Sequence, residues 1–232
     1  MRALAVIAAR GGSKRIPRKN IKEFCGQPII HYSIKAALES GVFEEVMVST
    51  DDAEIAEIAK AAGAQVPFMR SKENASDFAT TAEVVEEVVT GYKQSGREFD
   101  AICCIYPTAP FVTAQKLKDA MQLLKEKEAD SVLPVVRFSF PPQRSVIMED
   151  GFVKFKWPEH ALTRSQDLEP FYHDVGQFYF MNAKSFDTQK KLVMEKTVPI
   201  EMPELEVQDI DTEEDWQIAE VKYKVMQEKG RS

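Results

Sequence analysis

The chain of 232 residues is 44% apolar and 29% charged, and it carries a formal net charge of −7 at pH 7. This composition is ordinary for a soluble globular protein with one large or two modest domains. The acidic balance argues against non-specific nucleic-acid binding, and no apolar stretch is long enough to span a membrane.

The first predicted element is a buried strand, an unbroken apolar run over residues 3–9. The next segment, residues 10–22, is called the basic loop because it holds six basic residues and no acidic one. Gly11 and Gly12 let its backbone turn and bring N–H groups close to a ligand. At the carboxyl end of a strand, these features favour a polyphosphate site over the alternative of a solvated basic loop.

Strands and helices then alternate as far as residue 136. Strands are expected at residues 45–50, 66–68, 101–106 and 131–136, the second of them short. The first two helices are expected from about residue 30 to Gly41, and from a cap formed by Asp51 and Glu54 to Gly63. Two further helices are expected to begin at Thr80 or Thr81 and at about Thr113. Residues 70–79 are long and polar for a connection, which makes them a candidate binding loop. The alternation predicts a three-layer α/β fold with a mostly parallel sheet.

A different pattern begins near Phe138. Asp150-Gly151 between two apolar runs predicts a β-hairpin, and further strands are expected at 177–181 and 204–210. Thr212 and Asp215 form a capping box for a last helix, whose buried stripe includes Trp216, Ala219, Tyr223 and Met226. We therefore expect one α/β core, residues 1–137 and 179–232, with an inserted β-rich segment, residues 138–178.

The three cysteines are Cys25, Cys103 and Cys104, and the last two are adjacent inside an apolar run. We expect buried free thiols rather than disulfides or metal ligands. Residues 1–9 lack the basic region and cleavage site of a signal peptide. A cytoplasmic protein with no nucleic-acid or membrane partner is the resulting expectation.

The basic loop matches neither common nucleotide-binding motif. A P-loop needs Gly-x-x-x-x-Gly-Lys-Ser/Thr and the dinucleotide fingerprint needs Gly-x-Gly-x-x-Gly, and both are absent. A P-loop ATPase and an NAD dehydrogenase therefore lose their main support. A loop with many cations and few glycines suits a triphosphate whose charge must be neutralised while pyrophosphate leaves.

A second motif, Asp209-Ile210-Asp211, is a candidate metal site. On a strand, residues two apart point to the same face, so both carboxylates can reach one hard cation such as magnesium. Alternatively, Asp211 only caps the last helix and Asp209 is solvated. A triphosphate loop in the same sheet favours the metal interpretation.

Residues 8–20 resemble the nucleotide-binding signature of the acylneuraminate (CMP-sialic acid) cytidylyltransferase family. Their sequence is Ala-Ala-Arg-Gly-Gly-Ser-Lys-Arg-Ile-Pro-Arg-Lys-Asn. The resemblance continues through residues 48–52, 164–167 and 209–211, and it covers nearly the whole chain. Residues 104–111, 140–144 and 164–174 look most like members that act on pseudaminic acid. The resemblance implies a Rossmann-like nucleotidyltransferase fold, CTP and a nonulosonic acid as substrates, magnesium, and a homodimer paired through the inserted segment.

The resemblance also implies roles for individual residues. Arg10, Lys19 and Asp211 would be catalytic, and Asp209 and Asp211 would hold the metal. Arg164, and after it Arg144, would bind the sugar carboxylate because a guanidinium forms two parallel hydrogen bonds with it. Thr80 with Glu83 alternatively forms only a capping box, and the general base is left unassigned. The implied nucleotide-binding residues are Ala8, Arg10, Gly11, Gly12, Ser13, Lys19, Asn20, Arg70, Asp77, Thr80 and Thr81, and the implied sugar-binding residues are Tyr106, Thr108, Arg144, Arg164, Gln177 and Tyr179.

Two departures from the family pattern lie on the sugar side. Tyr106 stands where the sialic acid enzymes typically have glutamine, and Tyr172 stands where they commonly have a second arginine. An aromatic face can pack against a deoxy methyl group, which pseudaminic acid has and sialic acid lacks. We therefore expect transfer of CMP to the anomeric hydroxyl of pseudaminic acid. The alternatives are sialic or legionaminic acid, or a non-catalytic nucleotide-binding protein on the same fold.

Overall fold

The apolar run near the N-terminus forms β1 (Ala3–Ala8) in the computed structural model, which describes residues 1–228 and 230. β1 lies between β4 (Glu45–Ser49) and β5 (Ala101–Ile105) and is parallel to both. All three strands are almost fully buried, as expected for a parallel sheet that is covered on both faces. The predicted buried strands at these positions are therefore confirmed.

The sheet continues past β5 and contains two reversed strands. β10 (Phe178–Asn182) is antiparallel to both β5 and β6 (Ser131–Arg137), so β6 again runs parallel to β1. β11 (Thr197–Glu201) lies parallel to β6 at one edge, and β9 (Tyr172–Asp174) is antiparallel to the end of β6. The order is β11-β6-β10-β5-β1-β4, with β9 beside β6. The mainly parallel α/β sheet is confirmed.

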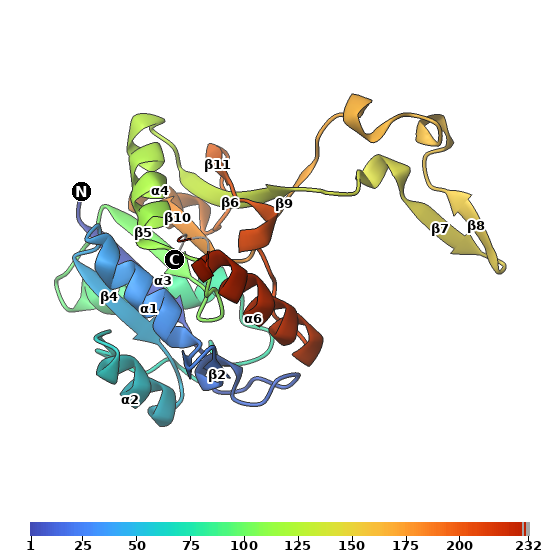
Figure 1. Cartoon of the computed structure of the whole chain (residues 1–232). Coiled ribbons are helices and arrows are strands. Elements are labelled where there is room, and N and C mark those ends of the chain that lie inside the picture. The colour runs from blue at the N-terminus through green and yellow to red at the C-terminus, as the bar shows by residue number, and fades with distance from the viewer. Residues whose placement is uncertain (229, 231–232) are drawn as a thin grey trace.

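Helices cover both faces of this sheet. Side chains alternate in direction along β1, so apolar residues of this strand face both ways and both faces need a cover. Ala5 and Ile7 pack toward one face, and Leu4 and Val6 pack toward the other. The first face is covered by α1 (Ile30–Ser40), α2 (Ala53–Ala61) and α4 (Ala114–Glu126), and the second by α3 (Thr81–Gln94) and α5 (Ala183–Gln189). Figure 1 shows the resulting three layers.

A third apolar cluster joins the basic loop to the last helix, α6 (Glu213–Glu228). The predicted stripe of α6 is buried here against Phe24 of β2 (Glu23–Phe24), which pairs with β3 (Gln27–Pro28). Ile16 of the basic loop and Ile210 belong to the same cluster, and each is 1% exposed. This cluster therefore brings two distant segments of the sequence together.

A long arm, residues 138–171, leaves the sheet after β6 and returns through β9. In Figure 1 it is the yellow-to-orange segment that extends far from the rest of the molecule. Its end is the predicted hairpin of β7 (Val146–Glu149) and β8 (Phe152–Phe155), with positive φ at Asp150 and Gly151 in the turn. All eight residues of the two strands are exposed.

The structure corrects three predicted details. Residues 66–68 form no strand, and only a single bridge joins Gln65 to Met47. Residues 204–210 are also not a strand, because they begin with a 3-10 turn and continue without regular secondary structure. Asp52, not Asp51, caps α2 by accepting hydrogen bonds from the N–H groups of Glu54 and Ile55. The 3-10 turns lie at Lys19–Ile21, Pro142–Arg144, Pro158–His160, Ser165–Asp167 and Glu204–Glu206.

Among the helices described, none is both long and apolar enough to cross a membrane. Cys103 and Cys104 are buried free thiols, and Cys25 is a half-buried one.

Candidate active site

The candidate site lies where the parallel strands end. The basic loop follows β1, Asp51 and Asp52 follow β4, and Tyr106 follows β5. Because these three strands are parallel neighbours, their carboxyl ends meet at one edge of the sheet. Ala8 ends β1 at this edge, so the basic loop starts beside the segments that follow β4 and β5.

The cations of the basic loop are paired with carboxylates from distant segments. Arg10 donates to Asp77 over 2.7 Å, and Arg15 donates to Asp211 over 2.7 Å. Arg18 pairs with Asp52, and this guanidinium lowers the pKa of Asp52 to about 2. The remaining pairs are Lys14 with Asp77, Lys19 with Asp211, Arg18 with Glu54 and Lys22 with Glu213.

The backbone of the loop is folded tightly at its start. The N–H of Gly11 donates to Asp51 over 2.9 Å, and the N–H of Ser13 donates to the Gly11 carbonyl over 3.0 Å. Asn20 is buried and donates its amide to the Arg10 carbonyl over 2.8 Å, so it ties the two ends of the loop together. The structure thus gives Asn20 a role in loop shape.

Gly11 is required by a close approach to Asp52. A Cβ atom on Gly11 would lie 2.7 Å from Asp52 Oδ2 and 3.0 Å from its Cβ, whereas a Cβ on Gly12 would meet nothing within 4 Å. We expect Gly11→Ala to lower the free energy of unfolding by about 1–3 kcal/mol, because Asp52 must leave its cap and its ion pair. Urea unfolding measures this. Gly12→Ala is the matched control, and equal losses in both variants would contradict the explanation.

The Asp209-Ile210-Asp211 motif reaches the basic loop through its central residue. Ile210 is buried in the third cluster with Ile16, and Lys19 donates to the Ile210 carbonyl over 2.6 Å. The Lys19 ammonium also lies 3.5 Å from Asp211. The prediction that both carboxylates sit on a strand is wrong, since these residues are outside any strand. Packing of Ile210, and not strand alternation, places them.

A divalent cation fits these two carboxylates. Desolvation, and after it the charge of Asp211, raises the pKa of Asp209, although the Asp209 residue as a whole is exposed. Across residues 1–228 and 230, no group of three or more potential ligands is preformed. Magnesium commonly takes one or two carboxylates and completes its shell with phosphate oxygens and water, so the donor set suits it.

The segment before Asp209 is anchored from three sides. Lys116 of α4 forms a buried 2.8 Å ion pair with Glu206, and burial lowers the pKa of Lys116. Gln177 donates to the Glu206 carbonyl over 2.6 Å, and Lys222 donates to the Val207 carbonyl over 2.7 Å. These contacts fix the position of Glu206 and Val207, which lie just before the acidic motif. Lys116 escaped the sequence analysis because a lysine in a helix carries no local sign of a buried partner.

Tyr106 and Tyr179 form an aromatic pair near the carboxyl end of β5. Their ring centroids are 5.6 Å apart, and burial raises the pKa of both hydroxyls. Tyr106 Oη lies 3.4 Å from Thr81 Oγ1, and Tyr179 donates to Asp174 over 2.6 Å. Asp174, which sequence reasoning missed, therefore orients the pair from the base of the arm.

Two of the three other candidates have structural partners. Arg70 is buried and donates to the hydroxyl and the carbonyl of Ser49, over 3.0 and 2.6 Å, at the end of β4. Thr80 caps α3 in a capping box with Glu83, which the sequence analysis gave as the alternative to nucleotide binding. Thr108 is half-buried in the turn after Tyr106.

The two candidate carboxylate-binding arginines lie on the arm. Arg144 ends a 3-10 turn and donates to Ser165 over 3.3 Å, and Arg164 precedes the next such turn. Both side chains are exposed. The arm that carries both arginines extends away from the sheet in Figure 1.

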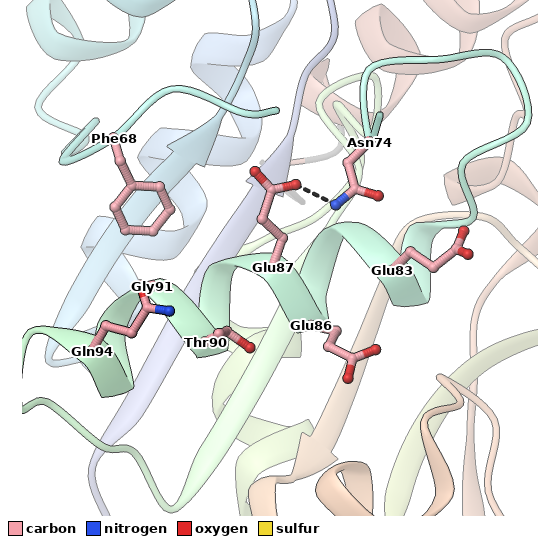
Figure 2. A pocket seen from close by; sticks show the side chains of 8 residues that line it. All are labelled: Phe68, Asn74, Glu83, Glu86, Glu87, Thr90, Gly91 and Gln94. Atoms are coloured by element: carbon pink, nitrogen blue, oxygen red, sulfur yellow. Dashed lines mark hydrogen bonds between the residues drawn. The ribbon is translucent and has the colours of Figure 1, made fainter. Parts of the chain in front are cut away.

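Asp77 is held near the basic loop by a residue that sequence reasoning missed. Glu87 of α3 accepts hydrogen bonds from the Ser71 N–H over 2.7 Å, from the Ser71 hydroxyl over 3.0 Å and from the amide of Asn74. Figure 2 shows Glu87 reaching from α3 to Asn74. The pocket in this view has Glu83, Glu86 and Glu87 in its lining and no basic residue, so it does not suit phosphate.

Comparison with known proteins agrees with this geometry. A family model described as cytidylyltransferase matches residues 4–219. The chain is 38% identical over 229 residues to a pseudaminic acid cytidylyltransferase of Campylobacter jejuni, covering 98% of this chain and 99% of the relative. It is 36% identical over 237 residues to a CMP-N,N'-diacetyllegionaminic acid synthase of Legionella pneumophila, with the same coverage.

Among solved structures, a CMP:2-keto-3-deoxy-manno-octonic acid synthetase complexed with CTP has a TM-score of 0.68 to this chain. Its sequence identity is 17%, and the match covers 98% of this chain and 100% of the other. At this identity, the likeness shows the nucleotidyltransferase fold alone.

Proposed function

The chain belongs to the cytidylyltransferase family, and from that premise we propose that it transfers CMP from CTP to the anomeric hydroxyl of a nine-carbon 2-keto sugar acid. The observation that carries the proposal is the convergence of Arg15 and Lys19 on Asp211. This contact places a cationic, glycine-containing loop directly against a carboxylate pair. Such a pairing of charges suits a triphosphate bound together with a divalent cation.

The proposed reaction is an in-line displacement at the α-phosphorus. The anomeric oxygen forms a bond to that phosphorus and loses its proton, the bond from the α-phosphorus to the bridging oxygen breaks, and pyrophosphate leaves with the bonding electrons. Arg10 and Lys19 neutralise charge on the phosphates, and the Gly11–Ser13 backbone turns beside them. Magnesium held by Asp209 and Asp211 would supply further neutralisation of the phosphate oxygens.

We propose pseudaminic acid as the sugar acid. The two full-length relatives named above differ by only two percentage points of identity, so overall similarity does not choose between their substrates. The support is against sialic acid, because the packed rings of Tyr106 and Tyr179 offer an apolar surface for a deoxy methyl group, which sialic acid lacks.

A panel of sugar acids tests this choice. Pyrophosphate release with CTP is expected to show a kcat/KM for pseudaminic acid about tenfold or more above that for sialic acid, since one packed methyl group discriminates by this order. Legionaminic acid is included because the Legionella relative is named for it. Equal kcat/KM values for pseudaminic and sialic acid would contradict the role given to Tyr106 and Tyr179.

We also propose a homodimer that the arm holds together. A two-stranded hairpin is marginal in water by itself, yet this one exposes Met148 by 86%, Phe152 by 72% and Val153 by 65%. A second copy of the chain is the proposed cover for this apolar surface. Such a dimer would also deliver Arg144 and Arg164 to the partner's site, where a sugar carboxylate needs a guanidinium.

A further inference from the structure

The basic loop is occupied by an internal anion. The two carboxylate oxygens of Asp77 accept hydrogen bonds from different cations, Oδ1 from Arg10 and Oδ2 from Lys14. Within residues 1–228, Asp77 is the only acceptor that the side chains of Arg10 and Lys14 contact. Hydrogen bonds from Lys14 and then from Arg10 lower the pKa of Asp77, so its carboxylate is charged at neutral pH.

Asp77 is held in this position from both sides of its segment. On one side, Glu87 fastens Ser71 and Asn74 to α3, as Figure 2 shows for Asn74. On the other side, Thr80 is fixed by its capping box with Glu83. The carboxylate between these two anchors is therefore presented to the basic loop by ordered chain.

Asp77 uses the groups that a phosphate would use. Its partners are the terminal Nη1 of Arg10 and the Nζ of Lys14, which are the charged ends of both side chains. An N–H that donates to a carboxylate is not available to a phosphate oxygen in the same direction. Lys19 differs, because it is also held by the Ile210 carbonyl, and its ammonium lies 3.5 Å from Asp211.

We propose that Asp77 is an internal competitor of the triphosphate, which must displace this carboxylate from Arg10 and Lys14 to bind. The inference rests on the proposed function, since that function assigns the triphosphate to the basic loop. Its consequence is that Asp77 weakens nucleotide binding and assists the departure of pyrophosphate by returning to the two cations. The competing view, that Asp77 positions Arg10 and Lys14 for the phosphate, predicts effects of opposite sign.

The Asp77→Asn variant tests whether Asp77 weakens or strengthens the binding of CTP. The substitution keeps the volume of the side chain but removes its charge, and we expect the dissociation constant for CTP to fall about threefold to tenfold, the order of two solvent-accessible ion pairs. Calorimetric titration without sugar acid measures it. The gain is expected to shrink in 0.5 M salt because exposed charges are screened. The inhibition constant for pyrophosphate is expected to fall by a similar factor.

Glu73→Gln is the matched control, because it removes one negative charge from the same segment. Glu73 is exposed and forms no ion pair with the part of the chain that the structure describes. We expect no change in its affinity for CTP. An equal gain in both variants would show that only net charge matters and would overturn the inference.

The same titrations with inorganic triphosphate separate the inference from the proposed function. Tighter binding of triphosphate by the Asp77→Asn protein supports the competitor role even if no variant binds CTP, and that second result would contradict the proposed function. Unchanged or weaker binding of both ligands by Asp77→Asn overturns the competitor role while leaving a CTP-binding enzyme intact.

Discussion

Replacing Asp211 by asparagine is expected to lower kcat by at least about a hundredfold and to change the free energy of unfolding by less than about 1 kcal/mol. The large effect follows because one carboxylate charge is lost where phosphate charge and a divalent cation are proposed to meet. The small effect follows because Asp211 pairs with Arg15 and Lys19 in a partly exposed setting, its side chain being 37% exposed. Pyrophosphate release at saturating CTP and urea unfolding measure the two quantities.

Glu213→Gln is the control for this variant, since Glu213 lies two residues further along and pairs with Lys22 at the start of α6. It should keep its turnover. If Asp211→Asn also kept its turnover, the protein would be better described as a nucleotide-binding protein on this fold. If it lost turnover and stability together, Asp211 would serve mainly to hold the basic loop to the last helix.

Replacing Phe152 by aspartate is expected to separate the proposed dimer. Phe152 is 72% exposed on β8. Burial of such a side chain stabilises by about 1.5–3 kcal/mol, and twofold symmetry counts it twice, so the dissociation constant should rise by about a hundredfold or more. Sedimentation velocity over a range of concentrations measures the shift. Turnover with the sugar acid should fall with the dimer, because Arg144 and Arg164 would no longer reach a partner's site.

Val221→Asp provides the comparison for the arm. Val221 is 61% exposed on α6, so the same kind of substitution is made outside the arm. We expect this variant to remain a dimer with unchanged turnover. Dissociation by Val221→Asp and not by Phe152→Asp would move the dimer contact to α6. A wild-type protein that sediments as a monomer at assay concentration would contradict the dimer itself.

Local signals in the sequence predicted many of the elements because each depends on neighbouring residues. Apolar periodicity identified the buried stripe of α6, and the capping boxes of Thr80 with Glu83 and of Thr212 with Asp215 are present as predicted. Asp150-Gly151 forms the hairpin turn because both residues take positive φ.

Local signals failed for β11 and for the cap of α2. β11 contains Pro199, which argues against a central strand, but β11 lies at the edge of the sheet, where proline is tolerated. Asp51 and Asp52 are both acceptable caps for α2. Only the approach of Gly11, whose N–H takes Asp51 as its acceptor, leaves Asp52 to cap the helix.

The sequence by itself determined the alternation of strands and helices, the cationic character of the loop after β1, and the existence of an apolar hairpin outside that alternation. The tertiary structure alone decided which carboxylate meets which cation, since the partners are 67 residues apart for Arg10 and Asp77 and 196 apart for Arg15 and Asp211. The sequence patterns of helices and strands depend on spacing along the chain. The ion pairs depend instead on tertiary contacts, namely the packing of Ile16 and Ile210 in one apolar cluster and the hydrogen bonds by which Glu87 holds the segment that contains Asp77.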